Sequence, residues 1–272
     1  MRHRQATLHF TLRPSLPASM LTLIVLSMML LAEPRVVRGE SDCDQDQSSD
    51  SMETTDPPEE IDPSTMLPDG PDEPITSSVN DEFSDTEKEA ADIIARFEGY
   101  STKVYYLTKD RTDPTIGRGF NFARNTAKKD FKEVLPERDF DSVKDGKEDL
   151  TKNEIDKLFA HDINANTVWV RNQVIGQKLF NSFPIEVQAA IVNGFYRGDI
   201  RKGDKTVELI KNEKWDCVPT EYLDHEGYRK ATKKNITGIV NRMDYNAAVF
   251  KKYAMELKKE QKKERKEKEG NE

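Results

Sequence analysis

Cysteine and histidine are both scarce in this chain of 272 residues, which has two cysteines and four histidines. The histidines are His3, His9, His161 and His225. Their spacing is not that of metal ligands, so we expect no metal site. Two cysteines form neither a metal cluster nor a disulfide framework. Unpaired cysteines are the favoured interpretation, and the alternative is an internal bridge between Cys43 and Cys217.

Long hydrophobic runs are also rare. Residues 20–32 form one uninterrupted apolar run behind a basic N-terminal stretch. Because a membrane span needs roughly 20 apolar residues, we interpret residues 1–39 as a signal peptide with its flanks. Cleavage would then fall between Ala32 and Gly39, and the chain would be secreted and extracellular. A retained signal anchor and a buried helix are the alternatives.

Motifs for nucleotides and for a serine nucleophile are missing as well. The sequence contains neither a phosphate-binding loop nor a Gly-x-Ser-x-Gly elbow. It also lacks the alternation of strands and helices that is typical of a parallel sheet. We therefore expect no cofactor.

Acidic residues are concentrated in one stretch. Residues 40–92 contain nineteen acidic residues and a single base, Lys88, so the stretch carries a net charge of about −18, whereas the whole chain carries −8. Its front part, residues 40–83, is predicted to be disordered because it has little apolar surface to bury. Residues 93–272 are slightly basic, which suits an anionic polymer such as peptidoglycan or nucleic acid. A solvated surface with a charged tail explains much of the same excess.

A glutamate is predicted at the end of the first helix after this stretch. Ser84 and Glu87 form a capping pair at the start of the helix, and Gly99 is a stop signal. Glu98 therefore falls on the last turn. The negative end of the helix and the aromatic residues that follow should both raise the pKa of its carboxyl, as a general acid requires. Alternatively, Glu98 is an ordinary solvated residue at a helix end.

The residues after Glu98 predict a β-hairpin. Residues 104–107 and 114–119 have the composition of strands, and residues 109–113 form a polar turn between them. A helix, Glu-Gly, a hairpin and Thr-Ile-Gly-x-Gly follow in that order, and this resembles the catalytic motif of the phage-type lysozymes, glycoside hydrolase family 24. By this resemblance Glu98 is the acid, and Thr115 is the threonine that opens the Thr-Ile-Gly strand.

The resemblance is incomplete at the second catalytic carboxylate. In the family an Asp stands nine residues after the Glu and six before the Thr, but these counts reach Leu107 and Lys109 here. The turn is longer and offers Asp110 and, as a weaker candidate, Asp113. We expect Asp110 to act as the catalytic base.

Further matches lie downstream, and the resemblance covers residues 86–253. A second capping pair begins a helix at Thr151, and the Gln-Ala-Ala sequence lies in an apolar helix that begins near Pro184. A family-like Arg242 lies in the helix near the end of the chain. The substrate-binding candidates are Asn121, Tyr196 and Arg197. Ordinary packing of an apolar helix explains the residues around Tyr196 equally well.

The implied fold is α+β and mostly helical, with a small β-hairpin lobe and a larger helical lobe flanking a cleft. We expect a lysozyme-like domain at residues 84–256 and a frayed, solvated tail at residues 257–272. The implied activity is hydrolysis of the β-1,4 bonds of peptidoglycan, in an antibacterial or digestive role. The alternative is a weakened relative that only binds peptidoglycan or a related sugar polymer.

The expected partner is peptidoglycan. We expect no nucleic-acid partner, no stable membrane association after the signal is removed, and a monomer. The sequon that begins at Asn235 predicts a glycosylation site if the chain passes through a eukaryotic secretory route.

Overall fold

A computed structural model describes residues 62–67, 74–106 and 111–270. The predicted signal peptide, Cys43, Asp110 and most of the acidic segment lie outside these residues. None of the described helices is both long enough and apolar enough to cross a membrane.

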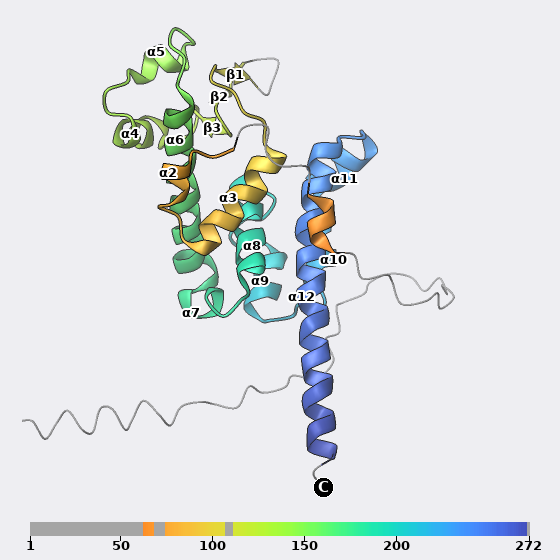
Figure 1. The fold of residues 1–272 in the computed structure, drawn as a ribbon. Helices are drawn as coiled ribbons and strands as arrows, with labels where there is room; N and C mark the ends of the chain where they lie inside the picture. The colour runs from red at the N-terminus through yellow and green to blue at the C-terminus, as the bar shows by residue number, and fades with distance from the viewer. Residues whose placement is uncertain (1–61, 68–73, 107–110, 271–272) are drawn as a thin grey trace, which may run out of the picture. The chain divides into compact units, whose positions relative to one another are not determined.

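Helices make up most of the described chain, and a small antiparallel sheet completes it (Figure 1). The helical elements are η2 (Pro63–Met66), α2 (Ser77–Asn80), α3 (Asp85–Phe97), α4 (Ala127–Val134), α5 (Phe140–Lys144), α6 (Lys152–Trp169), η3 (Val170–Ile175), α7 (Gln177–Phe180), α8 (Ile185–Arg197), α9 (Lys205–Lys211), α10 (Val218–Leu223), α11 (Glu226–Lys233) and α12 (Thr237–Glu269). The prediction of a mostly helical α+β fold is therefore confirmed.

The sheet has three strands instead of the predicted two. Strands β1 (Tyr105–Tyr106), β2 (Pro114–Ile116) and β3 (Phe120–Asn121) pair in that order. The second predicted strand ends at Ile116 because Gly117 and Gly119 have φ angles of 65° and 109°, which turn the chain back into β3. The two glycines are thus turn residues and not part of the strand.

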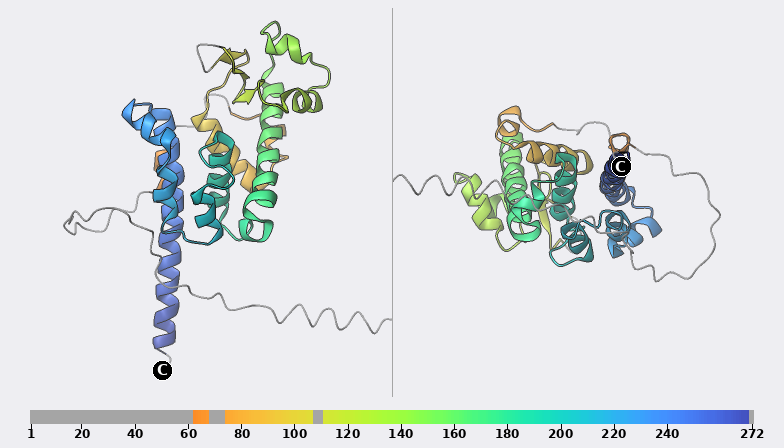
Figure 2. Two further views of the ribbon diagram at one scale, coloured as in Figure 1. Left: turned by 180° about the vertical axis from the view of Figure 1, so that it is seen from behind. Right: turned by 90° about the horizontal axis from the view of Figure 1, so that it is seen from below.

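Two predicted helix starts are confirmed by their capping boxes. Ser84 caps α3 with Glu87, and Thr151 caps α6 with Glu154. Helix α8 is buried nearly all round and packs against α3 and α12 (Figure 2), as expected for a central helix. Helices α3 and α6 therefore begin at the residues that their capping pairs predict.

A separate apolar cluster supports the sheet. It is formed by residues of β2, β3, α4, α5 and the first half of α6, and aromatic rings dominate it. Phe122, Phe131 and Phe140 pack on one another with ring centroids 5.4–6.0 Å apart. This cluster fixes the sheet at one end of α6, whereas α8 and α12 belong to a larger cluster.

Part of the segment predicted to be disordered is folded, which corrects the boundary at residue 84. Val79 and Phe83 are buried against α3 and α6. The Thr76 hydroxyl donates to Asp156 Oδ2 at 2.6 Å, and the Thr76 amide donates to the same atom at 2.9 Å. A few apolar side chains and the buried Asp156 are sufficient to fix residues 74–83 despite their acidic neighbours.

The tail is helical and not frayed. Helix α12 continues to Glu269, although residues 258–270 are exposed as predicted. Ion pairs one helical turn apart join Lys263 to Glu267 and Arg265 to Glu269. Such pairs each stabilise a helix by about 0.2–0.5 kcal/mol, and the preceding turns of α12 already provide the nucleus.

Cys217 is buried and disulfide-bonded, which contradicts the favoured interpretation of unpaired cysteines. Cys43, the other cysteine of the sequence, lies outside the described residues. A buried sulfur next to α10 is therefore held by a covalent bond in addition to its packing.

Candidate active site

Glu98 marks the point at which α3 ends and the chain turns toward the sheet. Its backbone amide donates to the Ile94 carbonyl at 2.9 Å, and its own dihedral angles are extended. Glu98 is therefore the C-terminal cap of α3, as the capping pair and the following glycine predict. Because α3 packs along α8, the side chain is held near the C-terminal end of α8.

Two arginines and an aspartate surround the Glu98 carboxyl. Arg197 Nε lies 2.7 Å from Glu98 Oε1, and Arg242 Nη1 lies 3.8 Å from the same oxygen. Arg242 also binds Asp199 through two bonds, each of 3.1 Å. Arg242 is thus fixed in place by Asp199, whereas Arg197 stands at the end of α8 with more of its side chain exposed, 28% against 6%.

Burial raises the pKa of the Glu98 carboxyl. Only 12% of the side chain is exposed, so removal from water disfavours the charged form. The positive charges of Arg197 and Arg242 partly offset this rise in pKa, while the negative charge of Asp199 adds to it. The direction agrees with the prediction, but the main cause is burial in a charged site. The helix end and the aromatic neighbours were the expected causes.

Thr115 lies in the middle of the sheet, between the other two strands. It is the register partner of Tyr105 on β1 and of Asn121 on β3. Its buried hydroxyl donates to the Asp113 carbonyl at 3.0 Å. Tyr105 lies near the Glu98 carboxyl. Burial and the charge of Glu98 both raise the pKa of the Tyr105 phenol. Tyr105 of β1 thus lies close enough to Glu98 to feel its charge and pairs with Thr115 on the neighbouring strand.

The predicted catalytic base, Asp110, lies outside the described residues. The flanking residues are described. Tyr106 pairs with Pro114, so residues 107–113 connect β1 to β2. The Arg111 guanidinium lies 4.2 Å from the centroid of the Tyr106 ring. Asp110 is the middle residue of this connection in sequence.

Tyr196 and Arg197 lie against the glycine turn of the sheet. The Tyr196 hydroxyl donates to the Arg118 carbonyl at 3.2 Å. A Cβ atom on Gly119 would lie 3.8 Å from Arg197 Nη1 and 3.9 Å from the Tyr196 hydroxyl. Asn121, the third predicted substrate contact, lies on β3, where its side-chain oxygen accepts from the Ala123 amide at 2.7 Å. Tyr196 and Arg197 thus lie between the Glu98 site and this turn of the sheet.

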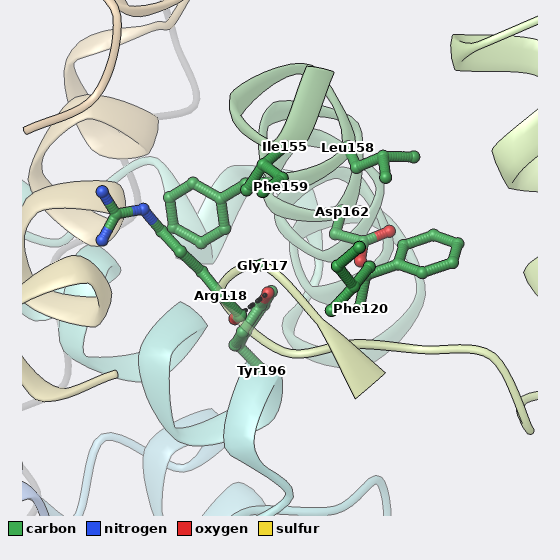
Figure 3. A pocket seen from close by; sticks show the side chains of 9 residues that line it. Gly117, Arg118, Phe120, Ile155, Leu158, Phe159, Asp162 and Tyr196 are labelled. Carbon is green, nitrogen blue, oxygen red and sulfur yellow. Dashed lines mark hydrogen bonds between the residues drawn. The ribbon is translucent and has the colours of Figure 1, made fainter. Parts of the chain in front are cut away.

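Figure 3 shows the side chains that surround the turn. The Arg118 carbonyl faces Tyr196, whereas the Arg118 side chain points away from Tyr196 and passes Phe159. The Arg118 guanidinium carbon lies 5.8 Å from the centroid of the Phe159 ring. A Cβ atom on Gly117 would come within 2.6 Å of Ile155 Cγ2. Only glycine allows both the positive φ angle and this close approach to α6.

Sequence reasoning missed the role of Asp199. It lies two residues after Arg197 and 43 residues before Arg242, and no local pattern marks it as the partner of that arginine. Arg242 was found through the family resemblance, with ordinary packing as the alternative. It is buried, but its contacts are with charged groups of this site.

Asn235, the predicted glycosylation site, is exposed between α11 and α12. Its φ angle of 53° places it in a turn, and Ile236 beside it is 44% exposed. An acceptor asparagine has to be accessible in this way, so glycosylation remains a prediction that fits the surface.

Within the described residues, no group of three or more His, Cys, Asp or Glu side chains is arranged to hold a metal ion. The sequence matches no protein-family model, and it matches no curated protein. The geometry around Glu98 is therefore the basis for assigning a function.

Proposed function

We propose that this chain is a secreted lysozyme that hydrolyses the β-1,4 glycosidic bonds of bacterial peptidoglycan, in an antibacterial or digestive role. Its sheet and its helices would be the two lobes of a lysozyme-like fold, with the substrate cleft between them. The observation that carries this proposal is the buried Glu98 carboxyl at the end of α3, whose raised pKa suits a proton donor. The sheet that bears Thr115 and the C-terminal end of α8 supply its neighbours.

Glu98 would protonate the oxygen of the leaving sugar. Hydrolysis with inversion also needs a carboxylate that orients water on the opposite face of the sugar, about 6.5–9.5 Å from the acid. Asp110 is the proposed base because it lies, in sequence, in the polar stretch between β1 and β2. Thr115 is the proposed residue that positions the water, and its buried hydroxyl would have to turn from the Asp113 carbonyl toward the cleft to do so.

Arg197 would have to release Glu98 before proton transfer. Its Nε lies 2.7 Å from Glu98 Oε1, where the leaving oxygen of the sugar would bind. Arg242 would keep its place because Asp199 holds it. Asn121, Tyr196 and the displaced Arg197 are the proposed contacts to the sugar.

A binding protein without catalysis is the second candidate function. The Arg197–Glu98 ion pair favours it, because an acid held by an arginine is not free to donate a proton. Leu107 and Lys109, which occupy the two positions where the family's spacing predicts an acid, favour it as well. In this case the same surface would hold a peptidoglycan chain without cutting it.

Clearing of turbid suspensions of purified bacterial cell walls tests the enzyme. The intact chain should clear them, and Glu98→Gln should lose at least roughly 10²- to 10⁴-fold in rate. Glu89→Gln is the matched control, because Glu89 lies on the same helix and burial raises its pKa too. Equal rates for the parent and a folded Glu98→Gln variant would exclude Glu98 as the acid. An inactive parent that still sediments with walls would support the binding protein.

A further inference from the structure

A groove adjoins the Glu98 site and shares Arg197 with it. This groove of about 440 Å³ has Gly119, Tyr196 and Arg197 at its lining, and it also reaches Trp169 at the end of α6. Arg197 belongs to both places, since it forms the ion pair with Glu98 and lines the groove. A polymer bound at Glu98 could therefore continue into this groove.

Trp169 is unusual in being large, apolar and 40% exposed. Its ring packs edge-on against Phe195 with 5.6 Å between centroids, which fixes its orientation. The other tryptophan, Trp215, is buried among Phe183, Phe250 and Tyr253. Trp215 is thus part of the hydrophobic core, whereas much of the Trp169 ring is exposed and could contact a ligand.

The polar lining of the groove carries charges of both signs. Arg124 binds Asp162 through two bonds of 2.6 and 2.8 Å and binds Asp130 at 3.1 Å. These contacts fix the planar groups in place but leave carboxylate oxygens with spare capacity to accept hydrogen bonds. Asn166 is fixed as well, because its amide nitrogen donates to the Val192 carbonyl at 3.0 Å. Mixed charges do not favour a polyanion, whereas they suit a neutral ligand with many hydroxyl groups.

A sugar ring matches this combination. Its C–H bonds carry slight positive charge and are attracted to the negative face of an indole, and its hydroxyl groups pair with fixed carboxylate, amide and guanidinium groups. We propose that the groove is a saccharide subsite with Trp169 as its platform, which holds units of the polymer away from the bond that is cut. The identity of the polymer, a β-1,4-linked chain of N-acetylated sugars, rests on the proposed function.

Tryptophan fluorescence can test this subsite without any hydrolysis. The full chain with Glu98→Gln is titrated with β-1,4-linked N-acetylglucosamine oligomers of two and of six units. Because Trp215 is buried, a change in emission on binding the six-unit oligomer should come from Trp169. It should disappear in the Trp169→Phe variant. A six-unit oligomer that leaves the emission unchanged overturns the proposal.

Calorimetry provides the second measurement. Trp169→Ala should weaken binding of the six-unit oligomer by at least about tenfold, as expected for a central aromatic contact, and should change two-unit binding much less. Trp169→Phe should lose less, because it keeps a ring against Phe195. Val168→Ala, an exposed neighbour that does not line the groove, should bind like the parent. Equal six-unit affinity for folded Trp169→Ala and the parent contradicts the subsite.

The two proposals can fail separately. If the parent does not clear walls but the Trp169 variants lose affinity, the lysozyme proposal fails and the subsite stands. If the parent clears walls and Trp169→Ala has the same KM and kcat as the parent, the subsite fails and the lysozyme proposal stands.

Discussion

Arg197 and Glu98 join the ends of two helices through an ion pair of 2.7 Å. The pair places a positive charge beside the buried carboxyl that caps α3, whose pKa is raised by burial. Arg242 is held by Asp199, but Arg197 is more exposed and lies beside a glycine turn. Arg197 is thus the partner of Glu98 that can be exchanged for substrate at least cost.

Removing the Arg197 charge should shift the pH dependence of activity. Because Arg197 lowers the pKa of Glu98, Arg197→Met should let that pKa rise further above its ordinary value. The protonated carboxyl is the active form, so the pH at which activity is lost on the alkaline side should move upward. The measurement is the rate of wall clearing from pH 4 to pH 9.

Other charged or titratable groups also face Glu98 and have to be unchanged in this comparison. They are Tyr105 on β1, Tyr196 on α8, Arg242 on α12 and Asp199. Arg201→Met, at an exposed position beyond α8, is the control. An unchanged alkaline limb in an active Arg197→Met protein would mean that Arg197 does not control the acid.

Glu154 should stabilise the protein in a manner that depends on pH. Arg138 binds its carboxylate through two contacts of 2.6 and 3.0 Å, and this hydrogen-bonded pairing lowers the pKa of Glu154 to about 2. A lowered pKa gives stability that is present above the ordinary value of about 4.3 and is lost as the pH falls toward 2. Glu154→Gln should therefore cost about 1–2 kcal/mol of unfolding free energy at pH 7 and much less near pH 2.

Urea unfolding at both pH values measures this difference. Glu148→Gln is the control, since Glu148 also faces Arg138 but at 3.7 Å and with 43% of its side chain exposed. An exposed pair of this kind contributes about 0–1 kcal/mol. Equal effects of the two substitutions would show that the α6 cap does not depend on the charge of Glu154.

The place of Glu98 could be predicted because local signals fix it. Ser84 and Glu87 set the start of α3, and the chain length from there puts Glu98 at the end of the helix. The charged groups around Glu98 could not be predicted in the same way. Arg197, Asp199 and Arg242 come together only after α8 and α12 pack on each other, and no local spacing records that contact.

The same contrast explains the errors in the fold. Gly117 and Gly119 were assigned to the second strand, and β3 has only two residues, which is too short for a strand signal. Residues 74–83 were assigned to the disordered segment because composition averages over many acidic positions. Two buried apolar side chains, Val79 and Phe83, outweighed that average through contacts with helices later in the chain.

The acidic segment is predicted to weaken binding to bacterial walls at low salt. Residues 40–61 contain nine acidic residues and no basic one, whereas residues 93–272 carry a net charge of about +6. The structure sets the limit of the deletion, because η2 begins at Pro63 and packs against α12. A chain without residues 40–61 should bind purified walls at least about threefold more tightly at 20 mM salt.

Salt provides the internal control for this comparison. At 1 M salt the screening length is about 3 Å, so the advantage of the shortened chain should vanish. A neutral segment of equal length, with Asn and Gln in place of the acids, should behave like the deletion if charge is the cause. Equal wall affinity for all three chains at low salt would contradict the prediction.

Asp110 is predicted to supply the second carboxylate. It is the middle one, in sequence, of the seven residues between Tyr106 and Pro114, and a carboxylate in a polar turn can be re-aimed by a bulge at small cost. Asp113 is the weaker candidate, since it precedes a proline and its carbonyl already accepts from Thr115. Asp110→Asn should lose roughly 10²- to 10⁴-fold in the rate of wall clearing, as expected for loss of a base.

The matched variant is Asp113→Asn, which should be affected much less, and both variants should still bind walls. The opposite order of effects would assign the base to Asp113.

A separate test asks whether the parent is inactive while Leu107→Asp or Lys109→Asp creates activity. Either gain would mean that the catalytic carboxylate has been lost from this chain instead of moved along the turn. The buried Glu98 would then be the remnant of an acid, and the protein would hold its polymer without cutting it.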